Sequence, residues 1–389
     1  MRSCRETGYI RRLVAALWCC MYVHGASGTS PEELMDARLR RIQEQCGVLC
    51  NTRRPTEVPR RHNRWSTRFN VSVAPVNCGW LLADGTGIDA TREQASPPEE
   101  LPAQWLDEFT MHGRLSVRKS YINDTLEAHT GNALQRTAAI TEGWQREKID
   151  GMVRQAQGLI RPPKGKERGS SPTSLGWAHW TRYRGLNREL WVGMHASNVS
   201  GADVLVIGSE SPWVEALCLG AGARRVMTLE YARILTDHPQ VTTLTPPQFL
   251  ARARAGTLPR FQVIVTASSV EHSGLGRYND GLNPWGDILA IARAWCVSAQ
   301  HARLVIAVPT AEHYRGGEAM DERRARLNGQ DAIVMNSQRT YGPVRYPYLV
   351  ANWRLDQRID GGERPAWGQT VYTFRKIGRS KAAAERPPA

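Results

Sequence analysis

The chain has 389 residues, a formal net charge of +14 and an ordinary hydrophobic content of 41%. This length allows one large domain with additional sequence or two domains, and 34 Gly with 22 Pro predict long irregular stretches. The positive charge comes mostly from Arg, and no basic run is interleaved with the aromatic residues that single-strand nucleic-acid binders use. We therefore expect this positive charge to attract an anionic small molecule or a glycan rather than a nucleic acid.

Residues 1–28 have the pattern of a signal peptide or a signal-anchor. Several Arg residues precede an apolar run from Leu13 to Val23, and small residues follow at 25–28. The apolar run is short for a transmembrane span, so an uncleaved anchor is the one membrane contact that we expect. The pattern predicts entry into the secretory pathway, with the protein in the lumen of the endoplasmic reticulum or Golgi, or secreted.

Three triplets that permit N-glycosylation agree with this localisation. They begin at Asn70, Asn123 and Asn198. Such triplets also arise by chance, so they add little weight on their own.

Five cysteines lie beyond the leader. In an oxidising compartment we expect one or two disulfides that involve Cys46, Cys50 and Cys78. Cys218 and Cys296 lie in apolar helical patterns and are predicted to be small core residues. The spacing of Cys46 and Cys50 lacks the partner ligands of a zinc site, and we expect no metal.

The first half of the chain divides into a leader, a stem and a helical extension. Residues 29–103 are polar and punctuated by Pro, which predicts a stem or linker of low order. Its one helical pattern, Pro31 to Val48, is interpreted as a solvated stem helix. Residues 104–174 form a helical extension, and 378–389 a disordered tail. The extension carries an apolar stripe that consists of Trp144, Ile149, Met152 and Val153.

Residues 175–377 alternate between buried strands and helices. Apolar, β-rich runs occur at 204–207, 225–229, 242–245, 261–266 and 303–308, with helical patterns between them. Two further strands, 353–359 and 369–374, are separated only by a loop, which favours an antiparallel pair. The chain is therefore predicted to be α/β, with a Rossmann-like, seven-stranded, mostly parallel sheet and a C-terminal antiparallel strand. This is the strand plan of the class I methyltransferase fold.

Two turns after predicted strands carry the residues of a nucleotide site. Gly208 follows the first strand, where a turn faces the ligand in doubly wound folds, and it would let a cofactor lie close to the backbone. Glu230 ends the second strand about twenty residues later, where such domains place an acid on the ribose hydroxyls. Strand punctuation and a solvated acid are the alternative interpretations of these two residues.

The segment after the fourth strand is the most distinctive in the chain. It runs from Ala267 to Tyr278 and contains Glu271 and His272 at the expected carboxyl edge of the sheet. The pKa of a histidine lies near working pH, so His272 is the candidate general base on an acceptor hydroxyl, with Glu271 to orient it. A structural histidine is the alternative. The predicted acceptor wall consists of Arg277, Tyr278, Asn283 and Trp285.

Three tracts resemble an uncharacterised domain-of-unknown-function family (DUF268), first named from Caenorhabditis proteins and grouped with methyltransferase folds. They are Val206–Ser209 with Pro212–Glu215, Ser268–Tyr278, and Arg339–Arg345. The similarity extends over roughly 105–377 and includes Phe109–Gly113. By analogy of fold it implies S-adenosylmethionine as the cofactor. The expected cofactor residues are Gly208, Ser209, Glu210, Glu230, Tyr231, Ser268 and Ser269, and Arg339 and Tyr341 join the expected acceptor residues.

The chain departs from the general methyltransferase pattern at several positions. Val206 stands where an acid usually contacts the amino-acid end of the cofactor, and Thr245–Gln248 lacks the acid that often meets the adenine amine. Gln338 stands where the family resemblance leads us to expect His. The sequence thus predicts an O-methyltransferase of the secretory pathway acting on a glycan or another hydroxylated acceptor. The alternatives are a non-catalytic scaffold with the same fold, and a nucleotide-sugar or dinucleotide enzyme, which the missing G-x-G-x-x-G disfavours.

Overall fold

The computed structural model describes nine stretches of the chain: 30–53, 74–83, 99–120, 122, 140–160, 186–278, 280–310, 331–359 and 369–378. The predicted leader, the sequons at Asn70 and Asn123, and almost all of the predicted tail lie outside these residues. Within the described part of the chain, no helix is both long and apolar enough to cross a membrane.

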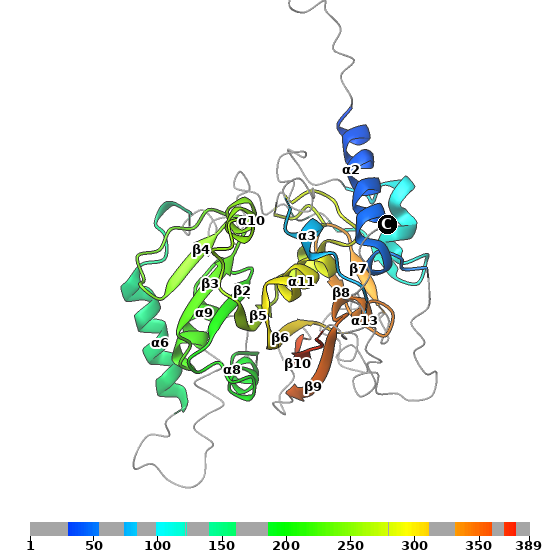
Figure 1. Cartoon of the computed structure of the whole chain (residues 1–389). Coiled ribbons are helices and arrows are strands. Elements are labelled where there is room, and N and C mark those ends of the chain that lie inside the picture. The colour runs from blue at the N-terminus through cyan, green and yellow to red at the C-terminus, as the bar shows by residue number, and fades with distance from the viewer. Residues whose placement is uncertain are drawn as a thin grey trace, which may run out of the picture.

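The centre of the molecule is a seven-stranded sheet. Its spatial order is β4-β3-β2-β5-β6-β10-β9 (Figure 1). Neighbours from β4 to β6 pair in parallel, whereas β10 pairs antiparallel with both β6 and β9. The strands are β2 (Asp203–Ile207), β3 (Arg225–Leu229), β4 (Val241–Leu244), β5 (Phe261–Ala267), β6 (Ser298–Pro309), β9 (Trp353–Ile359) and β10 (Gln369–Lys376).

This order is the strand plan of the class I methyltransferase fold, with the last strand inserted antiparallel next to the fifth. All seven predicted strands are present, and the sheet is mixed rather than fully parallel. The parallel strands were recognisable from sequence because strands buried on both faces are short, continuous apolar runs.

Two apolar cores cover the two faces of the sheet, because alternate residues of each strand point to opposite sides. Val204 and Val206 of β2 face one core, whereas Leu205 and Ile207 face the other. The first core is closed by α6 (Arg146–Ile160), α8 (Leu186–Ala196) and α9 (Trp213–Gly220). The second contains α10 (Pro246–Arg254), α11 (Gly286–Val297) and α13 (Tyr346–Leu349).

The predicted helical extension packs directly on the sheet domain. Trp144 and Ile149 are buried in the core beneath α6, and Met152 and Val153 pack against it. The predicted stripe is therefore the face that α6 buries.

The helix α2 (Pro31–Cys46) corrects the interpretation of this region as a solvated stem helix. Its Leu39 and Ile42 are fully buried in the same core as α11. A capping box begins the helix: the Ser30 hydroxyl accepts from the backbone N–H of Glu33, and the backbone N–H of Ser30 donates to the Glu33 carboxylate. The apolar positions were too few for a stripe to be obvious in a polar, Pro-rich region.

Short elements of the N-terminal region join α2 against this core. They are η1 (Gly47–Leu49), α3 (Cys78–Leu81), η3 (Ala103–Trp105) and α4 (Leu106–Thr110). A second sheet, which the sequence did not predict, pairs β1 (Ser116–Arg118) with β7 (Ala332–Val334) and β8 (Gln338–Thr340) in the order β1-β7-β8. Three-residue strands carry no readable alternation, so only the fold brings these segments together.

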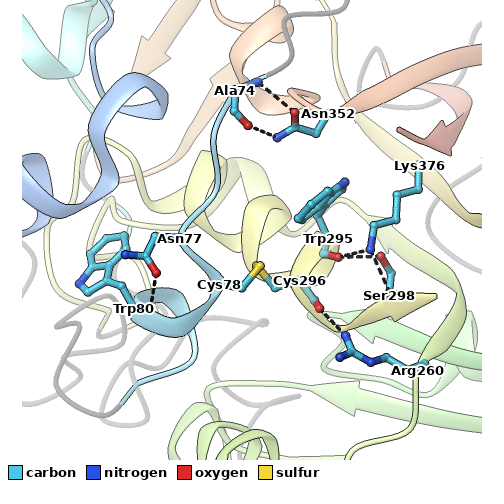
Figure 2. The surroundings of a disulfide bond; sticks show 10 residues. All are labelled: Ala74, Asn77, Cys78, Trp80, Arg260, Trp295, Cys296, Ser298, Asn352 and Lys376. Carbon is cyan, nitrogen blue, oxygen red and sulfur yellow. Dashed lines mark hydrogen bonds between the residues drawn. A yellow bond between two sulfur atoms is a disulfide. The ribbon is translucent and has the colours of Figure 1, made fainter. Parts of the chain in front are cut away.

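Two disulfides are present among the described cysteines. Cys46 pairs with Cys50, as the sequence allowed, and Cys218 is free and buried as predicted. The prediction for Cys296 was wrong, because it bonds to Cys78 across 218 residues of sequence. Figure 2 shows that this bond ties α3 to the end of α11.

Hydrogen bonds near that disulfide also hold segment 74–83 in place. The side-chain amide of Asn352 both accepts from the backbone N–H of Ala74 and donates to its carbonyl, each at 2.9 Å (Figure 2). The guanidinium of Arg260 donates to the carbonyl of Cys296 at 2.7 Å. Segment 74–83 is thus fixed to α11 by a covalent bond and to Asn352, which lies shortly after α13, by a pair of hydrogen bonds.

Candidate functional site

The carboxyl ends of β2, β3 and β5 meet at one edge of the sheet and carry the predicted cofactor residues. Gly208 follows β2 with φ +73°, and its N–H donates to the carbonyl of Leu229 at the end of β3. A Cβ on Gly208 would lie 1.6 Å from the hydroxyl oxygen of Ser269, which follows β5. Glycine is therefore required both by the left-handed backbone and by the close approach of Ser269.

The carboxylate of Glu230 is held in place by backbone N–H groups. Its Oε2 accepts the backbone N–H of Ser209 at 2.9 Å, and its Oε1 accepts that of Tyr231 at 2.7 Å. Glu230 is 9% exposed, so one small part of it reaches the surface. The predicted pairing of the glycine turn with the acid of the next strand is present in this structure.

Behind this turn lies a buried acid that the sequence analysis did not single out. Glu215 of α9 is fully buried and accepts hydrogen bonds from the hydroxyls of Ser209, at 3.0 Å, and Thr228, at 2.7 Å. Burial, reinforced by the charge of Glu230 and opposed by the two hydroxyls, raises the pKa of Glu215 to about 7. Ser209 thus bonds to both acids and links the glycine turn to α9.

Ser268, directly after β5, has a strained backbone. Its φ of +52° is unusual for a residue other than Gly, and its hydroxyl accepts from Nε2 of Gln369 at 2.7 Å. Gln369 begins β10 and lies opposite Pro309 in the register of β6. No local pattern in the sequence points to Gln369, because only the antiparallel insertion of β10 brings it to this edge.

Glu271 and His272 lie together in a buried 3₁₀ turn, η4 (Val270–His272). Nε2 of His272 is 3.8 Å from Oε1 of Glu271, and Nδ1 contacts the backbone carbonyl of Ser337. A carbonyl only accepts hydrogen bonds, so Nδ1 carries a proton and donates it to Ser337, and Nε2 is the ring nitrogen that faces Glu271. Burial raises the pKa of Glu271 to about 7 against the opposing effects of nearby amides, the Ser268 hydroxyl and Arg277.

Of the four residues predicted to form the acceptor wall, two are half-buried and two are fully buried. Arg277 and Tyr278 are half-buried, the guanidinium lies 5.2 Å from the Tyr278 ring centroid, and it is 3.4 Å from Nδ1 of His272. Asn283 and Trp285 are fully buried, which corrects their assignment. The side-chain oxygen of Asn283 accepts the N–H of Trp285, and the Trp285 ring packs edge-on against Trp105.

Arg339 is also corrected from an acceptor contact to an internal support. It is fully buried, and its guanidinium donates to the carbonyls of Ser273, at 2.6 Å, and Asn283, at 3.3 Å. These carbonyls belong to the loop that follows Glu271 and His272. Arg339 therefore stabilises the conformation of that loop from its buried side.

Tyr341 belongs to the same buried network, centred on Asp287. The carboxylate of Asp287 accepts from the Tyr341 hydroxyl at 2.9 Å and forms a two-pronged ion pair with Arg345, at 2.9 and 2.6 Å. Burial alone would raise the pKa of Asp287, but the guanidiniums of Arg339 and Arg345 outweigh it and lower the pKa to about 2. Asp287 lies in the first turn of α11, so this network fixes that helix against the loop.

No group of three or more His, Cys, Asp or Glu side chains among the described residues is arranged to hold a metal ion. The remaining predicted cofactor residue, Glu210, lies in the turn between β2 and α9 and is half-buried; its carbonyl accepts from Nε1 of Trp144.

Comparison with known proteins bears on the centre of the chain. Residues 201–315 match the family described as "Caenorhabditis protein of unknown function, DUF268". The match contains the first two tracts on which the resemblance was based, whereas Arg339–Arg345 and Phe109–Gly113 lie outside it. No curated protein matches the chain in sequence.

Solved structures with a similar arrangement include methyltransferases. The 1,6-didemethyltoxoflavin N1-methyltransferase of Burkholderia thailandensis is 17% identical with a TM-score of 0.32, over 50% of this chain and 79% of that one. The N-methyltransferase NodS of Bradyrhizobium japonicum is 13% identical with a TM-score of 0.27, over 49% and 93%. These values carry no argument about activity, and the fold assignment stands on the strand order itself.

Proposed function

We propose that this protein is an S-adenosylmethionine-dependent methyltransferase that acts on a hydroxyl group. The observation that carries the proposal is the convergence of two elements on one sheet edge. The Gly208 turn with its ordered Glu230 follows β2 and β3, and the Glu271–His272 pair follows β5. In doubly wound folds the carboxyl edge of the strands is where ligands bind.

The residues present fit the nucleoside end of the proposed cofactor. Glu230 offers an ordered carboxylate beside a left-handed glycine turn, which is the chemistry that ribose hydroxyls require. Ser269 packs on Gly208 and would border the same space. At the amino-acid end the usual acid is absent, because position 206 is a valine. Val206 is fully buried in the core. When bound, S-adenosylmethionine supplies a methyl group on a positively charged sulfur.

His272 is the proposed general base. Its Nδ1–H is held by the Ser337 carbonyl, so Nε2 can take the proton of an acceptor hydroxyl. The resulting imidazolium lies 3.8 Å from the Glu271 carboxylate, whose negative charge would stabilise it. Because the pKa of Glu271 is about 7, this support strengthens as pH rises through neutrality. Arg277 and Tyr278, half-buried beside the ring, would contact the acceptor.

The acceptor that we propose is a glycan or another hydroxylated molecule of the secretory pathway. The Cys78–Cys296 and Cys46–Cys50 disulfides support an oxidising compartment. The net charge of +14 and the position of Arg277 favour an acceptor with anionic groups.

A methyl-transfer assay with isotopically labelled S-adenosylmethionine tests the proposal. The full chain and the His272→Gln variant are incubated with a panel of neutral and acidic oligosaccharides, and cofactor binding is measured in parallel. We expect transfer by the wild type, and a loss of about 10²–10⁴-fold in the variant with unchanged cofactor binding. Full activity in the variant would refute the assignment of the base.

A second candidate, a scaffold protein with a non-catalytic methyltransferase fold, rests on a specific observation. The hydroxyl of Ser209 and the carboxylate of Glu230 already bond to the chain itself, and Ser269 lies against Gly208 where the glycine would otherwise leave space. A folded, purified protein that binds no S-adenosylmethionine would favour this candidate over the enzyme.

A further inference from the structure

The turn between α8 and β2 carries the one sequon that lies within the described residues, Asn198-Val199-Ser200. The N–H of Val199 donates to the carbonyl of Met194, and the N–H of Asn198 donates to that of His195. These two bonds form a Schellman motif, in which the residue at the position of Asn198 must adopt a left-handed backbone. Asn198 has φ +55°, and the next residue, Val199, is 1% exposed and anchors the turn in the core.

The Schellman motif accounts for an Asn at position 198 but gives no structural role to Ser200. Asn tolerates the left-handed region better than most residues, so Asn198 suits a helix end on structural grounds alone. Ser200 is exposed, and the Schellman bonds do not involve it. A hydroxyl two residues after an exposed Asn is what the glycosylation triplet requires.

The turn also has room for a bulky modification. Asn198 and Ser200 are both exposed, and a Cβ placed on the neighbouring Gly201 would meet no atom within 4 Å. Val199 is the sole buried member of the triplet, and it is the position at which the motif accepts almost any residue. A glycan on Asn198 would therefore extend into solvent without displacing packed atoms.

The turn lies at the amino end of the sheet, opposite to the proposed reaction site. β2 begins at Asp203, five residues after Asn198, and runs away from the turn towards Gly208 at its carboxyl end. The neighbouring strand β3 starts beside it at Arg225, paired with Asp203. A glycan here would leave the edge with Glu230 and His272 uncovered.

We propose that Asn198 is an N-glycosylation site. The side-chain nitrogen of Asn198 forms a bond to the anomeric carbon of an oligosaccharide carried on a lipid diphosphate. The bond between that carbon and the diphosphate oxygen breaks, the nitrogen loses one proton, and the lipid diphosphate leaves. The donor belongs to the same oxidising lumen in which the Cys78–Cys296 bond forms, so an independent feature of the fold supports its availability.

The test uses the full chain expressed with its own N-terminus in animal cells. Peptides of the purified protein are treated with peptide N-glycosidase in ¹⁸O-labelled water, which converts a glycosylated Asn into labelled Asp. We expect the label at Asn198 in the wild type and in Ser200→Thr, which keeps the triplet. We expect its loss in Ser200→Ala, which removes one hydroxyl from an exposed side chain and leaves Asn198 and its cap intact.

Two outcomes would overturn the proposal. In the first, the Cys78–Cys296 bond is present but the Asn198 peptide carries no label, which shows that the lumenal protein is not modified there. In the second, the protein stays outside the lumen and carries no label at any sequon. Neither outcome depends on methyl transfer, so the proposed enzyme activity is tested separately.

Discussion

The buried acid behind the glycine turn makes the stability of this protein depend on pH in a way that one substitution should remove. Glu215 is fully buried, and its carboxylate accepts hydrogen bonds from Ser209 and Thr228. Its pKa is raised from an ordinary value of 4.5 to about 7, mainly by burial. Gln has nearly the same shape and carries no charge. The Glu215→Gln variant therefore isolates the cost of ionising this side chain.

Because the pKa of Glu215 is raised in the folded protein, the free energy of unfolding falls as pH rises. Between pH 4.5 and 7 the folded protein keeps a proton on Glu215 that the unfolded chain has released, so the free energy of unfolding falls as pH rises. The contribution is fully present below pH 4.5 and is lost above pH 7. A shift of roughly 2.5 pKa units corresponds to about 3 kcal/mol. Glu271, whose pKa is also about 7, adds a second fall over the same range.

Urea unfolding at pH 5 and pH 8, with disulfides intact, measures the effect. At pH 5 we expect wild type and Glu215→Gln to differ by less than about 1 kcal/mol, because a Gln oxygen and amide can satisfy the two hydroxyls after they rotate. At pH 8 we expect the variant to be more stable by about 3 kcal/mol, while the fall due to Glu271 remains in both. A difference between the two proteins that is the same at both pH values would refute the assigned pKa and the reasoning from burial.

Three further substitutions test the packing of the site and its support. Gly208→Ala should lower the free energy of unfolding by about 2–5 kcal/mol, through backbone strain and overlap with the side chain of Ser269. In the same urea titration the control Gly256→Ala should lower it by about 1 kcal/mol, because Gly256 has φ +66° but nothing within 4 Å of an added Cβ. Replacing Cys78 and Cys296 together by Ser should lower the melting temperature and cost about 2–5 kcal/mol, and an unchanged melting temperature would contradict a bond that closes 218 residues. Arg345→Met should cost about 3–5 kcal/mol, because it leaves a buried carboxylate without its main partner; a loss below about 1 kcal/mol would show that the network contributes little.

The sheet was predictable from sequence because its signals are local. Each parallel strand is an apolar run, and the acid at Glu230 and the glycine at Gly208 follow such runs at positions that the fold assigns to a ligand. The sequence also placed Glu271 and His272 at the end of a strand, and the structure brings their side chains together.

Several features that the sequence did not reveal depend on contacts between distant segments. The partner of Cys296 is 218 residues away, and Gln369 reaches Ser268 only because β10 inserts antiparallel beside β6. Arg339 was expected among the acceptor residues because it lies in one of the tracts that resemble the family. The structure buries it, because backbone carbonyls of the loop that follows His272 and a nearby carboxylate, Asp287, surround its guanidinium.

The proposed function requires S-adenosylmethionine to bind at the edge formed by Gly208 and Glu230. Calorimetric titration of the full chain with S-adenosylmethionine, alongside Glu230→Ala and the distant surface variant Arg252→Ala, tests it most directly. We expect binding by the wild type and by Arg252→Ala, and a loss of at least tenfold in affinity for Glu230→Ala with the fold retained. Absence of binding by folded wild-type protein, or equal affinity in Glu230→Ala, would contradict the claim.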